Sequence, residues 1–524
     1  MTTAVKESLR HPIGSVRGIV RSGVASSAGN AIVNVANIGR DASIALAFGT
    51  GMIVDAFFLA IMFPIFIMTV GASAYRSTMI PILEKTIHAE GVLGVQKMIG
   101  RFMAVNAPIV LGAGIILALC APFYAPLISG SLPGDAATSI RLFTWAALPM
   151  FVVSAYANLA EGPLQTQGVF FLSSLMRAGL PLGMTFGAIV LGPQHGILGL
   201  CYGGLIGAML QMILASILLA QQGMLQGVRT PLKHGLGREV RGQFALLSAG
   251  VSLSYISPLI DQWMASFLEA GSVSILSYAN RLVVGAASLS IGALGPALLP
   301  HFSKLVARGD NSGLNRHYLA VIRLTLWASV AIAGVIWLLS EPIVVLLYER
   351  GNFTRLDSLA VANIVGWLCL QFPALLVGIV ASIVISAVSL NKVFIPLSIL
   401  VACVNVAANF ILMQWYGLVG IAISTAVTYV VSLITMNIVL YRKKIVRLPQ
   451  TLFIDLVASV GMASILALGL MAVDGKPGPV PTGQQILLST LAGGIYCLIA
   501  YLCARPTLAG IKGSTSNAGT QQCN

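Results

Sequence analysis

Long apolar runs fill almost the whole chain and constrain its fold more than any other feature. Each run is about 20 residues long, enough to cross roughly 30 Å of hydrocarbon as a helix. Hydrophobic residues make up 57% of the 524 residues and charged residues only 9%, whereas soluble domains are about one quarter charged. Strand-like alternation does not occur, so the sequence predicts an all-α polytopic membrane protein.

Fourteen of these runs are candidate transmembrane helices. Their approximate bounds are 24–48, 51–75, 101–128, 141–161, 168–192, 196–221, 244–269, 274–300, 317–347, 359–388, 391–415, 418–441, 451–473 and 484–504. An even number of spans places both termini on one side, and Lys and Arg gather in the segments of that side. The positive-inside rule therefore predicts cytoplasmic termini. The net charge of +14 is then a signal of topology and of contact with anionic membrane lipids, with no nucleic-acid partner.

Short motifs recur between the two halves of the chain. Ser27-Ala28-Gly29 is matched by Ser248-Ala249-Gly250, and MIPILEK from Met79 is matched by LLPHFSK from Leu298, at nearly equal spacing. A period of six helices predicts two lobes of the same orientation with a central cavity between them. The predicted division is a basic cytoplasmic N-terminus (1–23), a first lobe (24–222), a basic linker (223–243), a second lobe (244–442), two additional helices (443–507) and a disordered tail (508–524).

Three charged residues interrupt the first two apolar runs, namely Arg40, Asp41 and Asp55. A charge at the bilayer centre costs about 2.5–3.5 kcal/mol on insertion scales, so these side chains predict a water-filled cavity. Arg281 adds a second arginine from the other half, and two guanidinium groups on opposite walls would suit a diphosphate. The alternative is that Asp41 or Asp55 merely neutralises Arg40 inside a helix bundle.

A second polar group consists of Asp261, Asn405, Asn409 and Thr425. Asn405 and Asn409 are four residues apart and therefore share one helix face. Carboxylate, amide and hydroxyl oxygens are hard ligands, so the group is a candidate sodium site. The alternative is that each Asn simply bonds a neighbouring helix.

Other features point to packing and not to chemistry. The glycines that follow Arg177, at positions 179, 183 and 187, form a small-xxx-small stripe typical of close helix contact. The seven cysteines contain no CxxC pair, the six histidines lack ligand spacing, and no phosphate loop or HExxH motif occurs. The sequence therefore predicts a transporter and not an enzyme.

Five motifs carry a resemblance to a known family. They are GRDASIALAFGTGMIVDAFFLAIMFP (Gly39–Pro64), MIPILEK (Met79–Lys85), ASFLEAGSVSILSYANRL (Ala265–Leu282), LLPHFSK (Leu298–Lys304) and LYERGNFT (Leu347–Thr354). Together they resemble the MviN/MurJ-like lipid flippases of the multidrug/oligosaccharidyl-lipid/polysaccharide exporter superfamily. The resemblance implies a V-shaped, alternating-access transporter of the bacterial inner membrane. It would move an undecaprenyl-diphosphate-linked glycan to the periplasmic leaflet, with helices 13 and 14 forming a groove for the lipid tail.

The resemblance also implies roles for particular residues. It links Arg40, Asp41 and Arg281 to the diphosphate, and Asp55 matches the aspartate of the family's second helix. The sodium site described for some members falls on the second polar group, although Asn409 stands where that site has a carboxylate. Na⁺ is the one cofactor that the resemblance suggests.

Several positions depart from the family pattern. Asn34 and Met68 stand where well-studied lipid II flippases have cavity arginines, and Val284 replaces an acidic residue. Asn34 is still counted among the candidate substrate residues, with Arg40, Asp41, Asp55 and Arg281. With the diphosphate residues retained, these changes suggest a different headgroup, so the first hypothesis is an exopolysaccharide repeat unit and the alternative is lipid II. Two further alternatives are an ion-coupled multidrug exporter, which two cavity arginines disfavour, and a transport-inactive scaffold that recruits glycan-synthesis enzymes.

Overall fold

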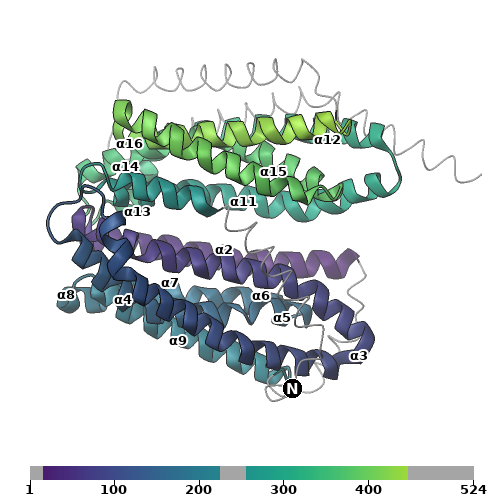
Figure 1. Cartoon of the computed structure of the whole chain (residues 1–524), viewed down its shortest axis with the longest axis horizontal. Coiled ribbons are helices and arrows are strands. Elements are labelled where there is room, and N and C mark those ends of the chain that lie inside the picture. Colours follow the sequence, from purple (N-terminus) through teal and green to yellow (C-terminus); the bar gives the residue numbers. More distant parts are fainter. Residues whose placement is uncertain (1–15, 225–254, 447–524) are drawn as a thin grey trace, which may run out of the picture. The chain divides into compact units, whose positions relative to one another are not determined.

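The computed structural model describes residues 16–224 and 255–446, and within these ranges every element is a helix (Figure 1). Eight helices of the described part are long and apolar enough to cross a membrane. The predicted all-α polytopic fold is confirmed, and the count of fourteen spans is consistent with these helices. The described residues do not include candidate spans 451–473 and 484–504, the predicted tail (508–524), residues 1–15 of the predicted N-terminal segment, or residues 225–254, which hold most of the linker and the start of candidate span 244–269.

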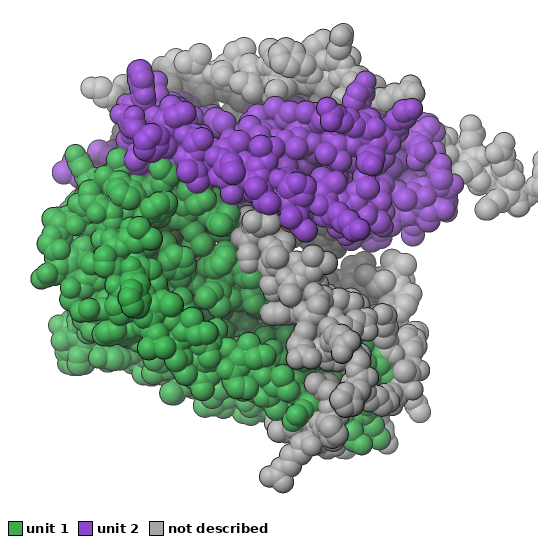
Figure 2. All heavy atoms as spheres, viewed as in Figure 1, with its two compact units in different colours: residues 1–277, 350–354 green, residues 278–349, 355–524 purple. Residues whose placement is uncertain are grey.

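The chain divides into two compact units (Figure 2). Unit 1 comprises residues 1–277 and 350–354, and unit 2 comprises residues 278–349 and 355–524. Unit 1 thus includes two segments from the second half of the sequence, 255–277 and 350–354.

Most of unit 1 is built from the helices of the first sequence half. They are α2 (Val16–Phe48), α3 (Met52–Ile128), α4 (Ala136–Asn158), α5 (Glu161–Thr166), α6 (Phe170–Leu175), η1 (Met176–Ala178), α7 (Gly179–Phe186), η2 (Gly187–Leu191), α8 (Gly192–His195) and α9 (Leu198–Gln221). α3 contains two spans joined at Gly91, whose φ of 68° interrupts the helical backbone. α4 packs against both α3 and α9, and α2 packs against α6 and α7.

The glycine stripe lets α7 and α9 approach to backbone contact. A Cβ atom on Gly183 would overlap the carbonyl oxygen of Gly203, and one on Gly179 would overlap that of Gly207. Gly187 in η2 meets Gly199 in the same way. The predicted role of the stripe in packing is confirmed.

Unit 2 contains most of α11 (Ser272–Ala307), whose first residues belong to unit 1. It continues with α12 (Asn311–Leu338), α13 (Ser340–Tyr348), α14 (Arg355–Leu368), η3 (Cys369–Gln371), α15 (Phe372–Ala387), η4 (Asn391–Val393) and α16 (Phe394–Arg442). Gly417, with φ of 55°, separates two helical segments within α16. The core includes Phe302, Trp327 and the buried Tyr318, whose hydroxyl donates to Asn437 Oδ1 at 2.8 Å.

Glycines with positive φ occur at matching positions in the two halves of the sequence. Gly196 and Gly417 both have positive φ (59° and 55°), and Gly130 and Gly351 do as well (56° and 62°). The two pairs are separated by the same number of residues. These matching positions support the duplication that the short motifs predict.

The close approach of α7 and α9 predicts a specific loss of stability. Replacing Gly203 with Ala should lower the free energy of unfolding by about 1–3 kcal/mol, because the added methyl group forces the backbones apart. The control is Gly112→Ala in α3, where no atom lies within 4 Å of the new Cβ, and it should leave stability unchanged or slightly raised. Thermal unfolding of the purified protein in detergent measures both, and equal effects would contradict the packing role.

Candidate functional site

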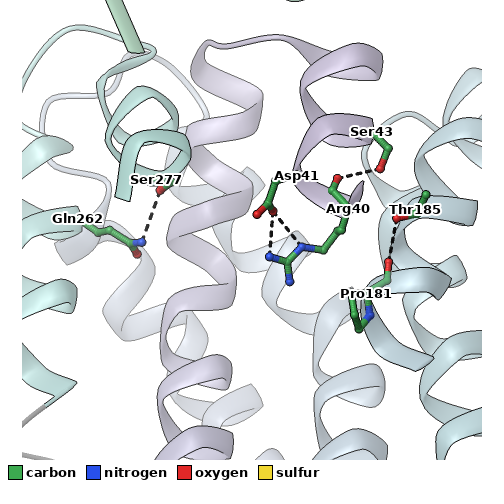
Figure 3. A network of polar contacts seen from close by, with 7 residues as sticks. All are labelled: Arg40, Asp41, Ser43, Pro181, Thr185, Gln262 and Ser277. Carbon is green, nitrogen blue, oxygen red and sulfur yellow. Dashed lines mark hydrogen bonds and ion pairs between the residues drawn. The ribbon is translucent and has the colours of Figure 1, made fainter. Parts of the chain in front are cut away.

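Arg40 and Asp41 form a buried ion pair on α2 (Figure 3). Their exposed fractions are 8% and 1%. Arg40 Nε donates to Asp41 Oδ1 at 2.9 Å, and Nη2 of the same guanidinium lies 2.9 Å from that oxygen. Because one carboxylate holds the guanidinium through two N–H groups, the orientation of Arg40 is fixed. The neutralising pair of Arg40 and Asp41, which the sequence analysis gave as the alternative, therefore exists. It also holds the planar, charged guanidinium in one orientation within an apolar helix.

One face of α2 carries polar side chains from the exposed Asn30 to the buried Arg40–Asp41 pair. Asn30, Asn34, Asn37 and Asp41 follow at intervals of four, three and four residues, which places them on one side of the helix. Asn30 is exposed, Asn34 and Asn37 are half-buried, and Asp41 is buried. Asn34, a predicted substrate residue, thus lies on a polar stripe that leads to the charged pair.

A second ion pair in unit 1 joins Glu161 of α5 to Arg177 of η1. Arg177 Nε lies 3.6 Å from Glu161 Oε1, and Gln165 Nε2 donates to the same oxygen at 3.2 Å. Arg177 also donates from Nη2 to Asn30 Oδ1 at the exposed end of the polar stripe. Sequence reasoning assigned Arg177 to packing and missed Glu161. The available signal was a carboxylate at the end of the apolar run 141–161, with an arginine 16 residues later.

Asp55, also predicted to contact substrate, is fully buried in the first turn of α3. Its Oδ2 accepts the backbone N–H of Gly271 at 2.5 Å, and its Oδ1 accepts that of Ser274 at 2.7 Å. α11 begins at Ser272, so the carboxylate caps the N-terminus of α11 as well as lying near that of α3. Both helix dipoles favour a negative charge there. In this structure Asp55 therefore joins two helix ends.

Gln262 makes a further polar contact with the start of α11 within unit 1. Gln262 Nε2 donates to Ser277 Oγ at 3.5 Å (Figure 3). The neighbouring Asp261, a candidate sodium ligand, is buried with an exposed fraction of 2%.

The other candidate sodium ligands lie on α16 in unit 2. Asn405 and Asn409 are completely buried, and Ser424 donates its hydroxyl to Asn409 Oδ1. Thr425 Oγ1 donates to the Ile421 carbonyl oxygen at 3.0 Å. The structure thus brings Asn409 together with Ser424, which sequence reasoning did not include, although it adjoins Thr425 in the sequence.

Two predicted groupings join residues of different units. Arg281 is half-buried on α11 in unit 2, whereas Arg40 belongs to unit 1. Asp261 likewise belongs to unit 1, and the remaining candidate sodium ligands belong to unit 2. The convergence of Arg40 with Arg281, and of Asp261 with Asn405 and Asn409, stays a prediction.

Comparison with known proteins places this arrangement in a family. The family model described as "Lipid II flippase MurJ" matches residues 44–476. A Vibrio cholerae protein named "Probable lipid II flippase MurJ" is 25% identical over 523 residues, covering 96% of this chain and 98% of the relative.

Solved structures share the fold. "Lipid II flippase MurJ, inward closed conformation" superposes with a TM-score of 0.73 at 20% identity, covering 91% of this chain and 99% of the other. An inward-facing multidrug resistance MATE transporter of the MOP superfamily reaches 0.65 at 14% identity, covering 81% and 98%. With a family model matched across most of its length, the chain belongs to the MurJ family of membrane transporters.

Proposed function

We propose that the chain translocates lipid II, a lipid-linked precursor of peptidoglycan, between the leaflets of the bacterial inner membrane. The family model and the Vibrio cholerae relative are both named for lipid II. The exopolysaccharide unit, which the sequence departures placed first, is not confirmed, and the relatives favour the alternative. The observation that carries the proposal is the buried Arg40–Asp41 pair at the end of a polar stripe on α2.

Arg40 is suited to hold the diphosphate of such a cargo. Its guanidinium offers several N–H donors in one plane, matching the oxygens of a phosphate. Asp41 fixes that plane and competes with the phosphate for the same donors, so binding stays weak enough for release. Arg281 would supply a second set of donors. The glycan would occupy the polar cavity while the polyprenyl tail stays in lipid.

The proposed cycle makes and breaks no covalent bond. The cargo enters from the cytoplasmic leaflet, the entry side closes, and the opposite side opens to release it. In this orientation both termini are cytoplasmic, as the distribution of Lys and Arg predicts. The membrane potential could bias the return of the empty carrier, at about 2.3 kcal/mol per charge per 100 mV.

Complementation tests the identity of the cargo. Expression of the full chain should restore growth to bacterial cells depleted of their own lipid II flippase, because the proposed cargo is the one those cells lack. Growth and lysis are the measurements, with chain abundance checked in the membrane fraction. Failure of rescue, together with repair of an exopolysaccharide flippase mutant, would reverse the assignment.

The paired N–H donors of the Arg40 guanidinium predict that even a substitution that keeps the positive charge will strongly reduce transport. Arg40→Lys keeps the charge but loses the paired donors, so transport should fall by roughly 10- to 100-fold, equivalent to one or two charged hydrogen bonds. Arg323→Lys in α12, outside the proposed site, is the matched control and should retain activity. Translocation of labelled lipid II in proteoliposomes measures both, and a fully active Arg40→Lys would contradict the role of the paired donors.

We also propose that Na⁺ binds weakly at Asp261, Asn405, Asn409 and Thr425, because one carboxylate among neutral oxygens gives limited charge compensation. Asn409→Asp adds a carboxylate and should therefore strengthen binding. NaCl, compared with choline chloride at equal ionic strength, should raise the unfolding temperature of this variant by on the order of 2 °C more than that of the wild type. Asn437→Asp, also buried on α16, is the control. No sodium-specific shift in the Asn409→Asp variant would refute the site.

A further inference from the structure

Two histidines meet where α11 and α12 form a helical hairpin in unit 2 (Figure 1). His301 lies six residues before α11 ends at Ala307, and His317 lies six residues after α12 begins at Asn311. Both are therefore about 9 Å from the turn, at a rise of roughly 1.5 Å per residue. His301 Nε2 lies 2.8 Å from His317 Nδ1, and the ring centroids are 4.8 Å apart. A separation of 16 residues is not a ligand motif, so only the hairpin reveals the pair.

The two ring nitrogens that face each other are spaced to share one metal ion. A neutral imidazole carries its proton on one nitrogen and a lone pair on the other. With the protons on His301 Nδ1 and His317 Nε2, the lone pairs of the facing nitrogens are both available. A metal ion about 2.0–2.1 Å from each nitrogen sets the two about 2.9 Å apart at a right angle and about 3.3 Å apart in a tetrahedron. The observed distance of 2.8 Å needs only a small widening.

The surroundings hold both rings in place and leave one side open. The sequence neighbours of the two histidines, Phe302 and Tyr318, are fully buried in the core of unit 2. The ring of His301 packs edgewise on Phe302, with 5.8 Å between the centroids. His317 is 9% exposed, and His301 itself is exposed. Lys304, one turn further along α11, is exposed as well, which indicates that a hydrated ion can reach this end of the hairpin.

The turn between the two helices is fixed by Asp310. Its Oδ1 accepts the backbone N–H of Gly313 at 2.8 Å and the hydroxyl of Ser312 at 2.9 Å, which caps α12. The same carboxylate acts electrostatically on His317 and opposes the positive charge of the neighbouring Arg316. Because the hairpin is already ordered, binding costs little conformational entropy. The carboxylate also offsets part of the repulsion that Arg316 would exert on a cation.

The kind of ion follows from the ligands. Among the residues that the structure describes, no group of three or more His, Cys, Asp or Glu is placed to hold a metal. The pair therefore offers two nitrogen ligands, and water would complete the coordination. Imidazole nitrogen suits Zn²⁺, Cu²⁺ and Ni²⁺, whereas Mg²⁺ and Ca²⁺ prefer oxygen ligands. The site thus differs in chemistry from the proposed sodium site, which consists of oxygen atoms.

We propose that His301 and His317 bind one divalent transition-metal ion of the Zn²⁺ class and thereby join the end of α11 to the start of α12. The ion would add a link across the hairpin and stabilise unit 2, because it binds the folded arrangement of the two rings and not the unfolded chain. The site shares no residue with the proposed cargo site or the proposed sodium site, so it is independent of the proposed function.

Zn²⁺ binding to the purified full-length chain, prepared without a polyhistidine tag, tests the site. At about 100 times its Kd, Zn²⁺ should raise the unfolding temperature by on the order of 5 °C, and Mg²⁺ at the same concentration should not. Gln can form a hydrogen bond but is a poor ligand for Zn²⁺, so His301→Gln and His317→Gln should each weaken binding about 100-fold, because the remaining imidazole then binds alone. His195→Gln, at an exposed histidine of α8 in unit 1, is the matched control and should bind Zn²⁺ as the wild type does.

The outcomes separate this pair from other metal-binding groups. A Zn²⁺ response that both Gln variants retain would overturn the proposal, and so would a wild-type response no larger than that to Mg²⁺. If the Gln variants fail to fold, electron paramagnetic resonance of Cu²⁺ bound to the wild type decides the question. Coupling to two imidazole nitrogens would support the site, and coupling to one or none would refute it. None of these measurements involves transport, so failure of complementation would refute only the proposed cargo.

Discussion

The polar groups left over at helix ends are the constraint on which the fold of unit 1 depends. A membrane-spanning helix satisfies its interior backbone but leaves donors at its start and acceptors at its finish. Here Asp55 binds the donors at the start of α11, while Ser131 and Asn352 bind acceptors at the ends of helices from the other half. Segments that are far apart in sequence are thereby joined through groups that any helix provides, and no dedicated recognition motif is required.

Charged side chains near α2 are likewise compensated by a carboxylate from a residue close to them in the fold. Arg40 is held by Asp41, and Arg177 is held by Glu161. Both pairs contact or belong to α2, whose polar face runs between them from Asn30 to Asp41. A charge that would be costly alone in a membrane is tolerated when its partner is a neighbour in the fold. α2 thus combines an apolar surface for packing with a buried guanidinium that its neighbouring carboxylate compensates.

The sequence predicted the features that depend on a local pattern, and it did not predict the contacts between residues that are far apart in the chain. Hydropathy predicted the helices, and the spacing of Gly179 and Gly183 predicted close packing, because both are periodic properties of one helix. The pairing of Asp55 with Gly271 has no periodic signature, since any buried carboxylate can cap any nearby helix. Arg177 was assigned to packing for the same reason: its partner, Glu161, lies on another element. The partners of the turns at residues 129–133 and 350–354 could not be predicted either, because a β-turn does not reveal which helix it will contact.

The matching turns at Gly130 and Gly351 have an evolutionary consequence. The turn at Gly130 contacts Ser266 in the second half of the sequence, and the turn at Gly351 contacts Leu46 in the first half. Two identical half-length chains in a symmetric dimer would exchange the same contacts, which is the self-complementary pattern of an isologous interface. The six helices per half that the sequence predicts would allow two such chains to lie parallel in a membrane. Gene fusion would have made the dimer permanent and allowed the two halves to diverge in sequence. One half then has the carboxylate of Asp55 at its helix start, and the other has the hydroxyl of Ser274.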